Sequence, residues 1–337
     1  MSYSFLAARK GHFVAVILAL CAPLFAGCSS SSVSPALPGA SAGPRSVREL
    51  SGSTYTFTTI DDPADPTYNV LTGINNLDKL AGYYGDGSTS HPAHGYIVYK
   101  PYGSQNFRRE DYPTAKDTYI TAINNRKALA GWFVPPDNQK NWVYGCGEKG
   151  GLWTEYKDPA LRHGTSNITE LLGLNDAGLA VGFYQDDKGI NHGFELNQQT
   201  GKYHGIVPPG VISVQATGIN GKGDIVGYGT VASGATVSWL LKGGGFTIFS
   251  YPLSLDTKAL SVNWQDQVVG KYVDPSGKTH GFILTDPLAS QSWTKVDEPN
   301  AAGATVVTSI EDHRNFVGYY VDQAGNTNGF LAMRKTK

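Results

Sequence analysis

The sequence has few charged residues and almost no cysteine. Only 16% of its 337 residues are Asp, Glu, Lys or Arg, and it contains three cysteines. Cys21 and Cys28 lie in or directly after an apolar leader, which leaves Cys146 alone in the rest of the chain. We therefore expect no disulfide within the mature protein and predict that Cys146 is a small apolar residue inside a strand.

Clusters of Lys and Arg interleaved with aromatic residues are also absent. The 27 basic residues less the two in segment 1–27 leave 25 against 28 acidic residues, a net charge of −3. Nucleic acid is therefore not an expected partner, because its binding depends on phosphate neutralisation. Outside the polar segment 29–53, where residues 39–43 read "GASAG", no Gly-x-Ser-x-Gly motif occurs, and the sequence has no His-Glu-x-x-His motif or Ser-x-Asp-x-Gly-x-x-Trp box. The sequence consequently assigns no catalytic residue and implies no cofactor.

The one long apolar run lies at the N-terminus. Arg9 and Lys10 precede "FVAVILALCAPLFA", a stretch of signal-peptide length that ends in Ala26-Gly27-Cys28. This resembles a bacterial lipoprotein signal, with Phe25 where Leu is usual. The resemblance implies removal of residues 1–27 and acylation of Cys28, including palmitate; plain secretion is the alternative. Ser29 implies sorting to the outer membrane, on its periplasmic or its surface side.

A polar segment separates this leader from the rest of the chain. Residues 29–53 are rich in Ser, Pro, Gly and Ala and contain almost no bulky apolar side chains. Such a composition cannot bury enough surface to offset the entropy of ordering. We therefore expect 28–53 to be the lipidated Cys and a flexible tether, and 54–337 to be the folded domain.

The remaining sequence is a sixfold repeat with a period of about 47 residues. Each copy begins with a Gly-Ile-Asn-like word whose last residue is followed seven positions later by a Gly. The first landmarks are Asn75, Asn124, Asn175, Asn220, Asn263 and Glu311, and the second are Gly82, Gly131, Gly182, Gly227, Gly270 and Gly318. A third word follows each pair, for example "HGYIV" and "HGFIL". The words are short, apolar and bounded by turn formers, which predicts strands joined by hairpins.

The fourth word fixes how the repeat closes. Five copies place an aromatic residue six positions before Pro, at the ends of the first five units, and the sixth, Phe57–Pro63, precedes the first unit. The last unit thus lacks a fourth strand that segment 55–60 can supply beside 328–333. Closure removes the unpaired edges of an open array. We predict an all-β, six-bladed β-propeller of four-stranded antiparallel blades with the Gly-Ile-Asn word innermost.

These landmarks resemble the extracellular HAF-repeat family over residues 55–333. Here the His-Ala-Phe word is His-Gly-Phe or His-Gly-Tyr in three units, beginning at His94, His192 and His280. The resemblance implies a secreted or surface propeller and transfers no active site.

The recurring histidines and aspartates have structural interpretations. Equivalent positions on different blades cannot converge within metal-ligand distance, so we expect each His ring to pack on an aromatic neighbour and bond to a backbone carbonyl. We expect "DDKGI", "DPSGK" and "DQAGN" to be hairpin turns rather than calcium loops, and no metal site is predicted. Carboxylates near the ends of the fourth strands leave glycoside cleavage open, although turn formation is favoured: Asp61, Asp62, Asp111, Asp158, Asp297 and Glu298.

Insertions give the best guide to a binding surface. The connections from second to third strand are longest in units one and two, and the connection from fourth to first strand is longest between units two and three. Both kinds of connection emerge on one face, where loops on a rigid scaffold carry binding groups. The candidate rim consists of Asp86, His91, Asp137, Trp142, Arg162 and His163.

We therefore predict a monomeric, lipid-anchored envelope protein that binds an unknown protein or carbohydrate through one face. A carbohydrate-active enzyme with carboxylates at the axial mouth and a structural or toxin-neutralising inhibitor are the alternatives.

Overall fold

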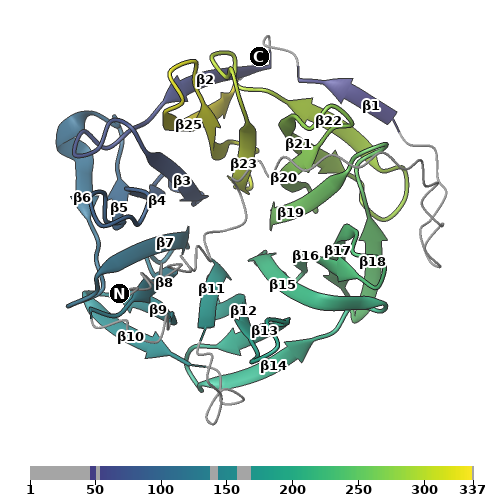
Figure 1. The fold of residues 1–337 in the computed structure, drawn as a ribbon, viewed down its shortest axis with the longest axis horizontal. Helices are drawn as coiled ribbons and strands as arrows, with labels where there is room; N and C mark the ends of the chain where they lie inside the picture. Colours follow the sequence, from purple (N-terminus) through teal and green to yellow (C-terminus); the bar gives the residue numbers. More distant parts are fainter. Residues whose placement is uncertain (1–45, 51–53, 137–142, 158–167, 336–337) are drawn as a thin grey trace, which may run out of the picture. The chain divides into compact units, whose positions relative to one another are not determined.

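The computed structural model describes residues 46–50, 54–136, 143–157 and 168–335. These residues form six antiparallel sheets that follow one another around a central axis (Figure 1). The predicted six-bladed β-propeller is confirmed. The single helical segment of the described part is a short 3-10 turn, η1 (Ser104–Asn106).

The blades use consecutive strands, with the exception of the last. Blade 1 contains β3 (Asn69–Ile74), β4 (Leu80–Tyr84), β5 (His94–Val98) and β6 (Phe107–Arg109). Blade 2 contains β7 (Asp117–Ile123), β8 (Leu129–Val134), β9 (Tyr144–Lys149) and β10 (Leu152–Tyr156). Blade 3 contains β11 (Ile168–Leu174), β12 (Leu179–Gln185), β13 (Asn191–Asn197) and β14 (Lys202–Ile206).

The other three blades continue the pattern. Blade 4 contains β15 (Val211–Ile219), β16 (Ile225–Val231), β17 (Thr236–Lys242) and β18 (Gly245–Phe249). Blade 5 contains β19 (Asp256–Val262), β20 (Val268–Val273), β21 (Thr279–Thr285) and β22 (Ser292–Val296). Blade 6 contains β23 (Thr305–Ile310), β24 (Phe316–Val321), β25 (Thr327–Arg334) and β2 (Tyr55–Thr59).

Blade 6 closes the ring as the displaced fourth word predicts. β2 pairs antiparallel with β25 from Tyr55 opposite Arg334 to Thr59 opposite Phe330. Ile60 continues the pairing by donating its N–H to the carbonyl of Gly329 at 2.9 Å. The Tyr55 ring lies 4.9 Å from that of Phe316, between centroids. The N-terminal strand therefore completes both the hydrogen bonding and the packing of the last blade.

Part of the expected tether is a strand. β1 (Ser46–Glu49) pairs parallel with the outer edge of β22, so blade 5 has a fifth strand. Leu50 donates its N–H to Lys295 O at 2.9 Å and packs against the core cluster of blades 5 and 6. An open sheet edge offers unpaired backbone groups to any nearby segment, which explains why even this polar stretch pairs there. The leader, Cys28 and the rest of the tether lie outside the described residues.

The core is divided into layers between neighbouring blades. Each of the six junctions has its own cluster of buried apolar side chains, with contributions from both blades. Cys146 is fully buried in β9, as predicted, and burial raises the pKa of its thiol. Among the described residues, no helix has the length and apolar character that a membrane crossing requires.

Every innermost strand has a β-bulge at the same position, three residues before the first landmark: Thr72, Thr121, Leu172, Thr217, Leu260 and Thr308. Where this residue is Thr, its hydroxyl lies 2.7–2.8 Å from a carbonyl oxygen of the next blade. A bulge bends the strand and redirects its side chains. Here it lets one hydroxyl fasten two blades near the axis.

The bulge also explains the repeated Gly of the second strands. A Cβ at any of the six landmark glycines would lie 1.9–2.2 Å from a carbonyl oxygen of the adjacent innermost strand. Any side chain there would force the two inner strands apart. The Gly landmark is therefore set by close backbone approach rather than by a positive φ angle.

Candidate ligand-binding site

The axis opens on one face into a cavity of about 360 Å³, which we call the mouth. Each blade contributes three consecutive residues from the end of its innermost strand: 74–76, 123–125, 174–176, 219–221, 262–264 and 310–312. The first residue of each triplet is aliphatic and also lines a narrower channel of about 90 Å³ below the mouth. The mouth therefore has an aliphatic floor and walls made by the second and third residues.

The second residues form a hydrogen-bonded ring of asparagines. The Oδ1 of Asn124 accepts the N–H groups of Arg126 at 3.0 Å and Ala128 at 2.9 Å, which closes its own hairpin. Its Nδ2 donates to the carbonyl of Asn175 in the next blade at 3.0 Å. The other four asparagines make the same inter-blade bond, at 2.9–3.3 Å. The Asn landmark thus holds a turn and links two blades.

Glu311 interrupts this ring in blade 6. Its carboxylate accepts the N–H groups of His313 at 2.6 Å and Asn315 at 2.7 Å and has no donor for the next blade. Burial raises the pKa of this carboxyl, against the opposing effect of those two N–H groups. The link to blade 1 comes instead from Asp312, whose Oδ2 accepts Asn76 Nδ2 at 2.7 Å.

The third residues form an upper ring that is polar in four blades and different in two. Asn76, Asn125, Asp176 and Asp312 connect neighbours, as Asn125 does by donating its N–H to Asp176 Oδ1 at 2.8 Å. Blades 4 and 5 have Gly221 and Trp264 at this position. These two adjacent substitutions make the mouth asymmetric.

Gly221 makes room for the indole of Trp264. A Cβ on Gly221 would lie 3.2 Å from both Cε3 and Cζ3 of that ring. Trp264 is 52% exposed and its backbone N–H donates to Asp312 Oδ1 at 2.8 Å. The result is a partly exposed aromatic surface fixed at the edge of a polar ring.

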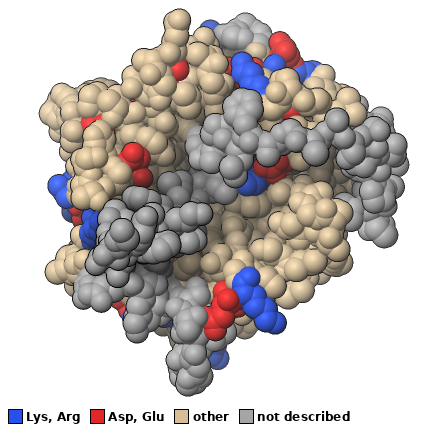
Figure 2. Space-filling view, in the orientation of Figure 1, with Lys and Arg blue, Asp and Glu red and all other residues tan. Residues whose placement is uncertain are grey.

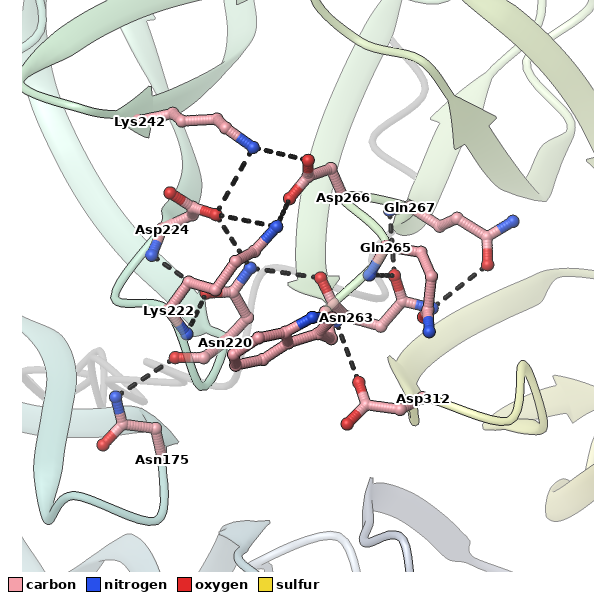
Figure 3. Close-up of polar contacts among 11 residues, drawn as sticks. Asn175, Asn220, Lys222, Asp224, Lys242, Asn263, Gln265, Asp266, Gln267 and Asp312 are labelled. Atoms are coloured by element: carbon pink, nitrogen blue, oxygen red, sulfur yellow. Dashed lines mark hydrogen bonds and ion pairs between the residues drawn. The ribbon is translucent and has the colours of Figure 1, made fainter.

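A network of two lysines and two aspartates links blades 4 and 5 (Figure 3). It lies next to the indole of Trp264, whose ring centroid is 5.6 Å from Lys222 Nζ. Lys222 Nζ and Lys242 Nζ each lie 2.5 Å from a carboxylate oxygen of Asp266, and both are within 3.7 Å of Asp224. The hydrogen bond to Asp266 raises the pKa of Lys242. Because both cations are neutralised here, they leave little positive charge for the mouth.

The lining of the mouth is uncharged or acidic. Among its residues, Asp176, Glu311 and Asp312 are acidic and none is basic. On the face that Figure 2 shows, the atoms not covered in grey are mostly uncharged, with separate small groups of acidic and basic side chains. The mouth is thus suited to uncharged or positively charged groups and opposes anions.

The structure places only part of the predicted rim. Asp86 and His91 are exposed in the β4–β5 connection, where His91 Nδ1 lies 3.5 Å from Asp65 Oδ2. Asp65 belongs to the connection from β2 to β3, so these two kinds of loop do meet on one face. This face is opposite the mouth, which is lined by the hairpins between the first and second strands of each blade, such as β3–β4. Asp137, Trp142, Arg162 and His163 lie outside the described residues, and the rim remains a prediction.

The histidines pack as expected but have different hydrogen-bond partners. The rings of His94, His192 and His280 lie 4.8–5.2 Å from a tyrosine ring, between centroids. Their nitrogens contact aspartate carboxylates rather than backbone carbonyls, for example His280 Nδ1 with Asp297 at 2.6 Å. The expected carbonyl partner is wrong, because turn and strand-end aspartates of the same blade reach the ring first. No metal-binding group of His, Cys, Asp or Glu occurs among the described residues.

The carboxylates considered for glycoside cleavage lie past the outermost strands, away from the mouth lining. Asp62 and Glu298 accept N–H groups two residues ahead in turns, at 2.9 Å and 2.6 Å. Asp61 and Asp111 accept N–H groups of the third strand, from Gly329 at 2.8 Å and Gly95 at 3.1 Å. Asp158 lies outside the described residues. Asp186, Asp274 and Asp322 form the expected hairpin turns.

The mouth residues were not identified from the sequence, although a signal was present. The residue after the first landmark is Asn, Asn, Asp, Gly, Trp and Asp in the six units. Aligning this position would have revealed two adjacent blades that depart from a polar consensus.

No family model and no curated protein sequence matches this chain. Its structure is similar to that of the fucose-specific lectin from Aleuria aurantia, with 11% identity, a TM-score of 0.50, and coverage of 80% of this chain and 97% of the lectin. TolB from Acinetobacter baumannii has 9% identity and a TM-score of 0.50, over 76% of this chain and 63% of TolB. At these identities the likeness shows the fold alone.

Proposed function

We propose that this protein is a carbohydrate-binding propeller of the bacterial envelope, and that the mouth is its binding site. Lipid on Cys28 would hold it at the outer membrane, in line with the leader and Ser29. The sixfold landmarks support placing it with the HAF-repeat propellers.

The exposed indole of Trp264 in the polar mouth is the observation that carries this proposal. Sugars present an apolar ring face surrounded by hydroxyls, so their sites combine a few aromatic surfaces with converging polar groups. The mouth supplies Trp264, the amides of Asn76 and Asn125, and the carboxylates of Asp176 and Asp312. Its volume of about 360 Å³ is near the lower end for small-molecule sites, which are ~300–1,000 Å³.

The acidic lining limits the class of sugar. A neutral sugar or an amino sugar can approach, whereas a sugar acid would bring a carboxylate next to Asp312 and Asp176. One protein of similar fold, the lectin of Aleuria aurantia, is described as fucose-specific. This makes a neutral sugar a reasonable first ligand to test.

A protein partner is the second candidate, with the predicted rim as its surface. Asp86 and His91 are exposed on the face opposite the mouth, as such a surface requires. Binding there would not involve Trp264, which separates the two proposals.

The test is a glycan array probed with residues 54–337 and with the Trp264→Ala variant. Loss of an aromatic anchor typically costs ~2 kcal/mol or more, so we expect at least about a tenfold loss of affinity for neutral glycans. Leu253→Ala is the matched control, since Leu253 is 88% exposed in the β18–β19 connection of the other face. Equal glycan binding by wild type and Trp264→Ala would refute the mouth as the site.

A further inference from the structure

The third strand of blade 2 departs from the other five. β9 has Cys146-Gly147-Glu148 where each neighbour has a bulkier or more apolar sequence, as in Tyr96-Ile97-Val98 of β5. The pairing registers make these positions equivalent, since Cys146 lies opposite Gly131 as Tyr96 lies opposite Gly82. At the position of Gly147 the other blades have Ile97, Glu195, Leu240, Ile283 and Leu331. At the position of Glu148 they have Val98, Leu196, Leu241, Leu284 and Ala332.

The missing side chain at Gly147 leaves a pocket of about 250 Å³ between blades 2 and 3. A Cβ on Gly147 would lie 2.7 Å from Gln198 Nε2 and 3.2 Å from Tyr156 Cε2, both of which line this space. The walls come from the β7–β8 and β11–β12 hairpins, from β9 and β10, and from the β13–β14 turn. The junction between blades 2 and 3 therefore contains an open space beside Gly147. Blades that have an aliphatic side chain at this position can fill the equivalent space.

The pocket lining has two basic side chains, Arg126 and Lys149, and two acidic ones, Glu148 and Asp176. Both carboxylate oxygens of Asp176 accept hydrogen bonds from Asn125, from its N–H and its Nδ2, each at 2.8 Å. Glu148 is only 8% exposed, and one of its carboxylate oxygens accepts the N–H of Gly151. Arg126 and Lys149 are exposed at its rim and form no ion pair within the described part of the chain. Tyr156 contributes a half-buried ring, and Gln198 contributes an amide.

We propose that this inter-blade pocket binds a monosaccharide unit that carries a carboxylate, of the hexuronic acid class. Arg126 and Lys149 pair with the carboxylate, because a guanidinium can bond both of its oxygens. Glu148 and the Gln198 amide bond the ring hydroxyls, and Tyr156 covers one face of the sugar. The pocket differs from the mouth in the charge of the ligand that we propose for it. The two cavities are neighbours, because Asn124 and Asp176 line both of them.

The test measures binding of glucuronate and galacturonate, with glucose and galactose as neutral partners, by titration calorimetry on residues 54–337 carrying Trp264→Ala, so that neutral sugars do not bind at the mouth. We expect the acids to bind at least tenfold more tightly than the neutral sugars. Arg126→Ala, an exposed substitution, should remove that preference. Equal binding of acids and neutral sugars by the Trp264→Ala protein, or no binding of either acid, would overturn the proposal.

Gly147→Leu is the decisive variant. It restores the residue found in blades 4 and 6. Its Cβ displaces the movable end of Gln198 and requires the Tyr156 ring, 3.2 Å away, to shift by a few tenths of an ångström, so the melting temperature should change little. Uronate binding should be lost while binding of neutral glycans at the mouth persists. Unchanged uronate binding in a folded Gly147→Leu protein would refute the pocket. Trp264→Ala should instead lose binding of neutral glycans and keep binding of uronates, so the two variants test the pocket and the mouth separately.

Discussion

Removal of β2 is expected to open the ring and abolish its stability. A protein that starts at residue 61 lacks the outer strand of blade 6, and β25 becomes an unpaired edge from Phe330 to Arg334. A protein that starts at residue 54 keeps β2 and loses only β1, which lies exposed on the outside of blade 5. The two truncations differ by seven residues, 54–60, and therefore isolate the closure.

The expected loss can be worked from the buried side chains. Tyr55 is 8% exposed and Ile60 is 4% exposed. Burying two large apolar side chains contributes ~1.5–3 kcal/mol each. The Ile60 N–H bond to Gly329 and the Lys335 N–H bond to Thr54 add about 1 kcal/mol each. The total of roughly 5–8 kcal/mol is comparable to the whole stability of a typical domain, about 5–15 kcal/mol.

Thermal unfolding and size-exclusion chromatography give the measurement. We expect residues 54–337 to unfold cooperatively as a monomer. We expect residues 61–337 to be unfolded or to aggregate through the exposed edge of β25. If the shorter protein were monomeric with a melting temperature within a few degrees of the longer one, N-terminal closure of the ring would be refuted.

Three further substitutions test the account of stability. Burial raises the pKa of Asp61 to about 6, so the folded protein binds a proton on the Asp61 carboxyl more tightly than the unfolded chain does. The stability that this protonation adds to the folded state is fully present below about pH 4 and is lost as the pH rises through 6. The melting temperature of wild type minus that of Asp61→Asn should therefore increase as the pH is lowered from about 7.5 to about 4.5. A difference that does not change with pH would contradict this. Gly270→Ala places a Cβ 2.0 Å from Lys258 O and should cost ~1–3 kcal/mol or more in urea unfolding, whereas Gly205→Ala, which has open space around it, should be nearly neutral. Asn124→Ala leaves buried backbone groups of two blades without a partner and should cost about 1–3 kcal/mol; no change would show that the asparagine ring does not hold the blades.

The repeat made the architecture predictable from the sequence. Landmarks with constant spacing give the number of blades and the order of strands, and the displaced fourth word gives the closure by β2. The number of blades, the order of strands and the closure all follow from strand pairing. Strand pairing depends on the local pattern of apolar and turn-forming residues and on the need to pair the open edges of the sheets. For the same reason the hairpin turns at Asp186, Asp274 and Asp322 were predictable.

The contacts between blades were not predictable in the same way. The carboxylate partners of His94 and His280 lie 17 residues further along the chain, and spacing alone does not select them over a nearby carbonyl. β1 was missed because its pairing depends on an available edge rather than on its own weak strand pattern. The mouth and the pocket at Gly147 arise where single blades depart from the repeat, so they become visible only when equivalent positions are compared.

The most direct test of ligand binding at the mouth uses Gly221→Asn. This change restores the polar residue common in the upper ring and places a Cβ 3.2 Å from the Trp264 indole, so it displaces the ring without removing it. Binding of the best neutral glycan is measured by titration calorimetry against wild type. We predict at least a tenfold loss of affinity with an unchanged melting temperature. Wild-type affinity in the folded Gly221→Asn protein would contradict the assignment of the mouth as the binding site.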